Sequence, residues 1–225
     1  YRFTWLRDTA FTLEALFNLG HLSEMDGYLN WLKGLIRRCG AEKLQVMYGL
    51  RGEEDLAEEE LPHLEGYKGS RPVRVGNAAA GQRQLDIFGE TLNAALKLSN
   101  YVGKVDRDLW NSLARLCDYV ADHWREPDQG IWEVRGGPRD YVHSKVMCWV
   151  ALDRGLTIAR RYGFPGNLPL WRNAARAIRA EVLERGWSDR ARAFRQHYDT
   201  DDLDATGLLI PLVGFLPFDH PKVTA

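Results

Sequence analysis

Apolar residues recur at steps of three and four along most of the chain, the spacing that places them on one face of an α-helix. One clear run extends from Trp110 to Trp124 and a second from Trp171 to Val182. The segment 146–152 is apolar around more of its circumference, which predicts a helix buried on two sides. Only the segment 44–50 alternates briefly as a β-strand does, so the pattern predicts an all-α fold. Further helices are predicted over residues 9–19, 22–38, 82–101 and 203–215.

Tight turns and long loops alternate between these helices. Gly20, Gly103 and the segment 163–169 mark tight turns. A unit of helix, tight turn, helix and long loop repeats about every 60 residues, and helical hairpins with such a period build toroids or solenoids. We therefore expect a single domain over residues 1–225. The longer connections cover residues 40–81, 126–142 and 186–202.

Composition excludes several classes of protein. The chain carries 30 Lys and Arg against 31 Asp and Glu, and it has no basic stripe, which argues against nucleic acid binding. No segment approaches the roughly 18–20 apolar residues of a membrane span. The odd number and wide spacing of Cys39, Cys117 and Cys148 fit neither a disulfide framework nor a zinc site. Cys117 and Cys148 are predicted to be buried free thiols, which favours a reducing compartment and a cytoplasmic location. We expect no metal and no cofactor.

One candidate for chemistry is Glu133, which follows Trp132 on a glycine-bounded loop, residues 130–136. A carboxyl group beside an indole, on a loop between two helices, suits a proton donor to a glycosidic oxygen. The indole then gives the sugar ring an apolar surface to stack on. The alternative is a surface glutamate beside a tryptophan that plugs the core, and spacing alone favours this alternative.

Two further polar groups stand where helices are predicted to begin. Arg7 and Asp8 are suited to hold sugar hydroxyls by paired hydrogen bonds. Alternatively, Asp8 caps the helix and Arg7 pairs on the surface. Gln84 and Asp86 follow a loop of small residues, and their alternative role is to start the next helix. The polar segment 192–204 is either the wall of a cleft or a solvent-exposed loop.

Taken in order, these motifs resemble glycoside hydrolase family 15, which contains glucoamylases, glucodextranases and bacterial trehalases. The resemblance spans essentially the whole chain. It implies an (α/α)6 barrel of six inner and six outer helices, with the active site at the end that carries the long loops. The motifs that carry it are residues 1–8, 47–50, 69–79, 84–86, 130–136, 144–151, 203–205 and 211–215.

The resemblance also implies inverting hydrolysis of a terminal α-glucosidic bond by an acid, a base and a water molecule. Glu133 matches the general acid. Arg7 and Asp8 match the pair that holds the non-reducing glucose. Fungal glucoamylases have a second glutamate where this chain has Val134, so we expect Arg135 to take part in recognising the leaving group. The residues expected to bind substrate are Arg7, Asp8, Trp132, Trp5, Gln84, Asp86 and Arg135.

No residue of the chain matches the family's general base. Six hairpin repeats need roughly 360 residues, so we interpret the chain as a partial (α/α)6 catalytic domain and expect it to be inactive alone. The first hypothesis is release of glucose from maltooligosaccharides or related α-glucosides, and α,α-trehalase activity is the rival within the family. A helical-repeat module that binds carbohydrate or protein is the non-enzyme alternative. Another α/α toroid enzyme, such as a sugar epimerase, needs catalytic histidines, and His143 and His197 lack a supporting motif. Homo-oligomerisation through an open barrel edge remains an alternative.

Overall fold

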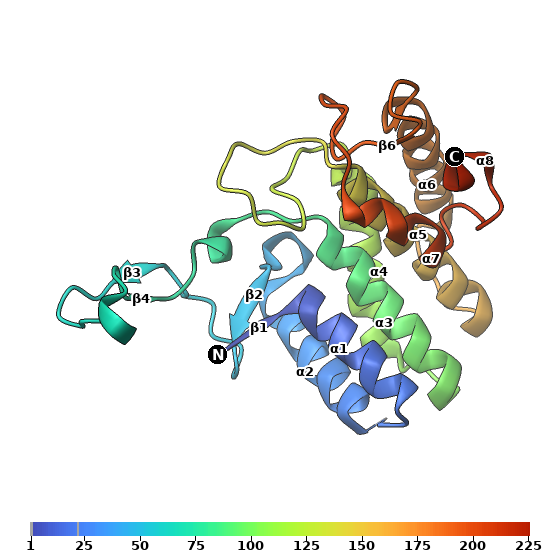
Figure 1. The fold of residues 1–225 in the computed structure, drawn as a ribbon. Helices are drawn as coiled ribbons and strands as arrows, with labels where there is room; N and C mark the ends of the chain where they lie inside the picture. Colours follow the sequence, from blue (N-terminus) through green and yellow to red (C-terminus); the bar gives the residue numbers. More distant parts are fainter. Residues whose placement is uncertain (1, 22) are drawn as a thin grey trace.

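The computed structural model describes residues 2–21 and 23–225, and three helical hairpins make up most of them (Figure 1). Each hairpin joins two helices through a short turn, as the periodicity predicts. Gly103 and Gly163 adopt left-handed conformations that end the first helix of the second and third hairpins. The hairpins are α1 (Leu6–Asn18) with α2 (Ser23–Cys39), α3 (Asp86–Val102) with α4 (Arg107–His123), and α5 (Val142–Tyr162) with α6 (Leu168–Arg185).

The six helices form two layers. Helix α3 packs between α1 and α5, and α4 packs between α2 and α6. The first helix of every hairpin therefore belongs to one layer and the second helix to the other, which is the alternation expected of an (α/α) toroid. The closest approach between α3 and α5 requires Gly89, because a Cβ there would lie 2.3 Å from the carbonyl oxygen of Met147.

Helix α5 is the most deeply buried element, as its apolar circumference predicts. Its buried positions face both layers, and they include Cys148. Cys117 on α4 is also buried, and both thiols are free, as predicted. Burial raises the pKa of Cys148 to about 12. The buried apolar residues of α5 are Val146, Met147, Cys148, Val150, Ala151, Leu152, Ile158 and Ala159.

The long loops gather at one end of the helical layers, and the short turns lie at the opposite end (Figure 1). These loops, together with the segment before α1, contain three two-stranded antiparallel sheets, of which the sequence pattern predicts only one strand. The pairs are β1 (Phe3–Trp5) with β2 (Met47–Gly49), β3 (Glu59–Glu60) with β4 (Arg74–Val75), and β5 (Trp187–Ser188) with β6 (Ala193–Phe194). Single 3-10 turns occupy Ala41–Lys43, Tyr67–Gly69 and Ala78–Gly81.

Two predicted helices differ from the structure. The predicted helix over residues 203–215 is wrong as one helix: the segment contains a 3-10 turn, Ala205–Leu208, and the short α7, Leu209–Leu212. Gly214 takes a positive φ and ends this segment, which is followed by the short α8, Pro221–Thr224. Helix α3 begins at Asp86 rather than residue 82, because the backbone at Gln82 is extended. Within the described residues, none of the helices combines the length and apolar character needed to cross a bilayer.

Candidate active site

The short sheet β1–β2 places the first group of functional side chains. Trp5 is the last residue of β1 and pairs with Met47, and the next amide, that of Leu6, donates to the carbonyl of Val46 at 3.0 Å. Helix α1 starts at once, so Trp5 and Arg7 are held at the loop-bearing end of the layer formed by α1, α3 and α5. The first motif thus ends a strand at Trp5 and begins a helix at Leu6, and this change brings Trp5 and Arg7 to the same end of the fold.

Arg7 is buried at the centre of a polar cluster. Its Nη1 donates to Gln84 Oε1 at 2.6 Å and to Asp86 Oδ2 at 2.9 Å. Both partners are almost completely buried, so Arg7 is not the surface pair considered from the sequence. Burial alone would lower the pKa of Arg7, but the charges of Asp86, Asp8 and Glu133 outweigh it and raise that pKa above its usual value.

Glu133 meets the same cluster from the loop between α4 and α5. Its Oε1 accepts a hydrogen bond from Trp5 Nε1 at 2.7 Å and from Arg7 Nη2 at 3.3 Å. The side chain is 27% exposed. Its backbone has φ of 52°, a left-handed conformation that is unfavourable for a residue with a side chain. Such strained residues concentrate at functional sites.

Residues 82–84 connect this loop, which we call the Glu133 loop (residues 128–139), to the start of α3. Gln82 Nε2 donates to the carbonyls of Glu133 at 3.1 Å and Val134 at 3.3 Å. Gln84 Nε2 donates to Gln82 Oε1 at 3.0 Å. Gln84 thus contacts Arg7 through its oxygen and the support of the Glu133 loop through its nitrogen.

Trp132 lies at the edge of the cluster rather than in it. Its indole is 56% exposed, and its Nε1 donates to Asp204 Oδ2 at 2.7 Å. Burial would raise the pKa of Asp204, but hydrogen bonds from Thr206, Gln196 and Trp132 lower it overall. An exposed indole face beside a carboxyl group can stack against a sugar ring, as expected for Trp132.

Two predicted residues do not join the cluster. Asp8 is exposed in the first turn of α1, and it does not cap the helix, because the N-cap position is Trp5. The side chain of Arg135 is 71% exposed and pairs with Glu58 Oε2 at 3.5 Å. Glu58 also pairs with Arg74 of β4, so Arg135 lies against the start of the β3–β4 hairpin, whose strand residues are exposed.

Three buried residues that support the Glu133 loop have no role assigned to them by the sequence motifs. Asp128, Ser144 and Lys145 are almost completely buried. Lys145 Nζ donates to the carbonyls of Trp124 at 2.8 Å and Glu126 at 2.9 Å, and it pairs with Asp140 at 2.9 Å. For Asp128, the signal in the sequence is its position two residues before Gly130, a spacing typical of an Asx turn.

His143 is a buried residue beside the cluster. Both ring nitrogens lack a hydrogen-bond partner among the described residues. Burial lowers the pKa of His143, although Asp86 and Asp204 act in the opposite direction. His197 lies elsewhere, near Arg139, with 3.3 Å between the two side-chain nitrogens. The structure does not bring these two histidines together with Glu133 as a histidine-based site would require.

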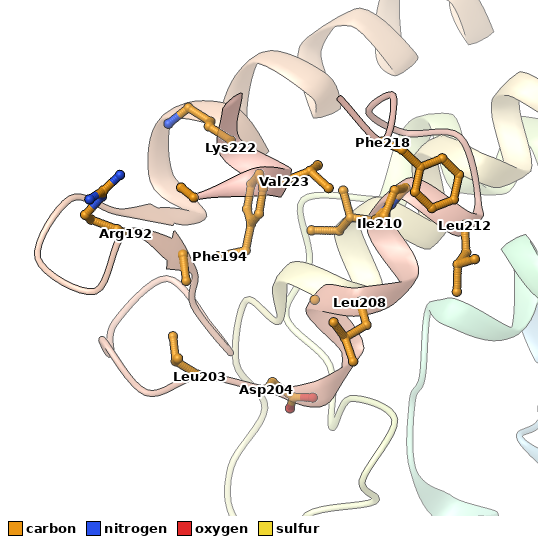
Figure 2. A pocket seen from close by; sticks show the side chains of 14 residues that line it. Arg192, Phe194, Leu203, Asp204, Leu208, Ile210, Leu212, Phe218, Lys222 and Val223 are labelled. Carbon is orange, nitrogen blue, oxygen red and sulfur yellow. The ribbon is translucent and has the colours of Figure 1, made fainter. Parts of the chain in front are cut away.

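A separate hollow of about 560 Å³ lies between β6, α7 and α8 (Figure 2). Phe194, Ile210 and Val223 face one another across it, and Asp204 stands at its rim. A sugar needs several convergent polar groups, whereas this hollow is mainly apolar. We therefore assign the candidate site to the cluster around Arg7 and Glu133 and not to this hollow.

Comparison with known proteins identifies the family of the chain. The family description "Glycosyl hydrolases family 15" matches residues 1–225. The chain is 45% identical to a trehalase of Mycobacterium tuberculosis, over 99% of this chain and 33% of the trehalase. It is 36% identical to a trehalase of Thermoplasma volcanium, over 99% of this chain and 35% of that protein. The chain thus spans about a third of the length of these relatives.

Solved structures show the same fold. A glycosidase variant in complex with glucose matches with a TM-score of 0.76 and 19% identity, covering 99% of this chain and 58% of the other. The wild-type glycosidase also gives a TM-score of 0.76, with 18% identity. The helical hairpins are therefore part of a helical glycosidase fold. By its family match over all 225 residues and its identity with the trehalases, the chain belongs to glycosyl hydrolase family 15.

Proposed function

We propose that this chain forms the acid side of the active site of an enzyme that hydrolyses trehalose, with Glu133 as the general acid. The observation that carries the proposal is the pair of donors on one oxygen, Oε1, of Glu133. A carboxylic acid that accepts hydrogen bonds at one oxygen carries its proton on the other. Oε2 has no hydrogen bond among the described residues and is therefore free to present the proton to substrate.

The reaction follows from this arrangement. Glu133 Oε2 gives its proton to the glycosidic oxygen as the bond from that oxygen to the anomeric carbon breaks. A water molecule attacks the anomeric carbon from the opposite face and gives its proton to a second carboxylate. In trehalose the leaving group is itself glucose, so the products are two glucose molecules. We assign the second carboxylate to a part of the enzyme outside these 225 residues.

Arg7 has a structural and an electrostatic role in this proposal. Its buried charge is balanced by Asp86, and its Nη2 orients Glu133. When Glu133 becomes a carboxylate after proton transfer, the same guanidinium stabilises the new charge. Asp8 and Trp132 are the groups that we expect to contact the sugar, through hydroxyls and ring stacking respectively.

Trehalose is favoured over maltooligosaccharides by the relatives. The chain is 34% to 45% identical to six trehalases from bacteria and archaea. The sequence motifs alone gave preference to maltooligosaccharides, and these relatives favour the rival hypothesis. Arg135, which follows Glu133 by two residues in the chain, is exposed and pairs with Glu58, and this pair is our candidate contact with the second glucose.

The test is glucose release from trehalose and from maltotriose by the full-length enzyme. We expect release from trehalose, and we expect Glu133→Gln to lower kcat by at least about 1,000-fold with little change in KM, because an amide cannot donate the acidic proton. Glu184→Gln, at an exposed position on α6, is the matched control and should retain activity. Release from maltotriose alone would contradict the substrate, and an active Glu133→Gln enzyme would contradict the acid.

A further inference from the structure

The carboxylate of Asp128 joins three segments at the base of the Glu133 loop. Its Oδ2 accepts from the backbone amide of Leu85 at 2.7 Å. Its Oδ1 accepts from the amide of Gly130 at 3.2 Å and from Ser144 Oγ at 3.0 Å. The side chain is 1% exposed, so water does not compete for these donors. One buried group thus connects the start of α3, the Glu133 loop and the first turn of α5.

The backbone of Asp128 closes the same loop. Its amide donates to the carbonyl of Arg139 at 3.0 Å, and its carbonyl accepts from the amide of Arg139 at 2.7 Å. The two ends of the Glu133 loop are therefore fixed to each other at Asp128. Gly130 has φ of 67°, and a Cβ there would lie 2.8 Å from the ring of Tyr141. The turn into the loop is thus held tightly against the residue that precedes α5.

Two of the three donors, Leu85 and Gly130, lie on opposite sides of the contact between Arg7 and Glu133. Leu85 stands between Gln84 and Asp86, the two residues that bind Arg7 Nη1. Gly130 begins the turn whose fourth residue is Glu133, and the Glu133 amide donates to the Gly130 carbonyl at 3.2 Å. A movement of Asp128 would therefore shift the guanidinium and the acid relative to each other.

From this geometry we propose that Asp128 is a positioning residue for the reaction: it fixes Glu133 against Arg7 and Trp5 without touching the substrate. The inference rests on the function proposed above, since it assigns Asp128 a role through Glu133. A displacement of about 1 Å in a catalytic group can cost on the order of 100-fold in rate. The hydrogen bonds of Asp128 that prevent such a displacement should therefore contribute to the rate.

The environment of Asp128 gives the role a pH dependence. Burial raises the pKa of Asp128 to about 6, and the charge of Asp86 on α3 acts in the same direction. Hydrogen bonds from Leu85 and Ser144 and the charge of Lys145 on α5 oppose the shift. Tyr141 and Cys148, the other titratable groups that interact with it, are uncharged near this pH. Below about pH 6 the carboxyl group gains a proton, and one of its three donors loses an acceptor.

The test uses Asp128→Asn in the full-length enzyme, with trehalose as substrate. An asparagine of the same size presents one oxygen and one NH2 group, so either Leu85 or Gly130 faces a donor instead of an acceptor. We expect kcat to fall by about 10- to 100-fold while KM changes by less than about threefold. We expect the wild-type kcat to fall below about pH 6, where Asp128 gains its proton, and we expect the variant to lack this fall. An unchanged kcat would overturn the proposal.

Asp118→Asn is the matched control. Asp118 also accepts a hydrogen bond from a buried group, Trp171 Nε1 at 2.7 Å, but it lies on α4, in the layer formed by α2, α4 and α6. We expect this variant to retain the wild-type kcat and pH profile. An equal loss of kcat in both variants would show that Asp128 acts only through general stability.

Amide hydrogen exchange separates this inference from the proposed function. In wild type, the protection of Leu85 and Gly130 should fall as the pH drops through about 6, whereas protection within α5 should persist. This measurement needs neither a variant nor a substrate, so it decides the role of Asp128 at the loop even if Asp128→Asn does not fold or trehalose is not cleaved. Constant protection of both amides between pH 7.5 and pH 5 would refute it.

Discussion

At the scale of single residues, buried hydrogen-bond partners determine the orientation of the Glu133 carboxyl group. Glu133 is partly exposed, yet its Oε1 accepts from the indole of Trp5 and the guanidinium of Arg7. Arg7 in turn is fixed by Gln84 and Asp86. Each donor removes a rotational freedom that the carboxyl group would have in water, so its orientation is determined before substrate arrives.

Trp5→Phe tests the donor that makes the shorter hydrogen bond to Glu133, 2.7 Å against 3.3 Å for Arg7. Phenylalanine retains an aromatic ring but has no N–H, so Glu133 Oε1 keeps only Arg7. Hydrogen bonds to a charged group are worth about 1.5–3 kcal/mol, and we expect kcat for trehalose to fall by about 10- to 100-fold. Trp187→Phe, which removes the indole bond to Asp189 in an exposed loop, should leave kcat at the wild-type value. If both variants behave alike, the indole of Trp5 does not orient the acid.

At the scale of secondary-structure elements, helix α3 carries two buried acidic residues one turn apart, Asp86 and Glu90. Asp86 is neutralised by Arg7. Burial raises the pKa of Glu90 to about 8, and the charge of Asp86 contributes to the shift while Arg7 opposes it. Glu90 is therefore protonated at neutral pH. It lies on the side of α3 that faces α1.

The raised pKa of Glu90 predicts how stability varies with pH. The unfolded chain releases this proton near pH 4.5, whereas the folded protein keeps it until about pH 8. The free energy of unfolding should therefore fall as the pH rises between these values and level off above them. Glu90→Gln removes this cost, so urea denaturation of the full-length protein should show a stabilisation of a few kcal/mol at pH 8 and little at pH 4.5. A stabilisation of equal size at both pH values would contradict the assignment.

The helices could be predicted from sequence because their signal is local. The step of three and four residues identifies α4 and α5 without knowledge of any partner. Of the strands, the local alternation of residues 44–50 indicates only β2. The partner strand β1 is three residues long and forms only because Phe3 pairs with the distant Gly49. The same limit applies to the site. Motifs identify Arg7 and Glu133, but Asp128 has its role only because Leu85, 43 residues away, approaches it in the folded chain.

At the scale of the whole molecule, the described residues form three helical hairpins in two layers, and the segment after α6 exposes apolar side chains. Four of the apolar side chains that line the hollow between β6, α7 and α8 (Figure 2) are more than half exposed. The chain spans 33% to 38% of the length of its trehalase relatives. The second carboxylate and the closing wall of the glucose site therefore belong, in our proposal, to the remaining length of such a protein. The exposed apolar residues around the hollow are Leu203, Leu208, Leu212 and Phe218.

We accordingly predict that the 225-residue chain on its own does not release glucose from trehalose. It supplies Glu133 and the residues that orient it, but inversion also needs a base about 6.5–9.5 Å from the acid to activate water. The measurement is glucose release by the isolated chain and by the full-length enzyme at equal concentration, with helical circular dichroism confirming that both are folded. Turnover by the folded chain at a rate near that of the full-length enzyme would mean that a base lies within these residues. In that case Asp8 and Asp204 would be the first residues to replace by asparagine. Asp8 follows Arg7 in the chain, and Asp204 accepts a hydrogen bond from Trp132.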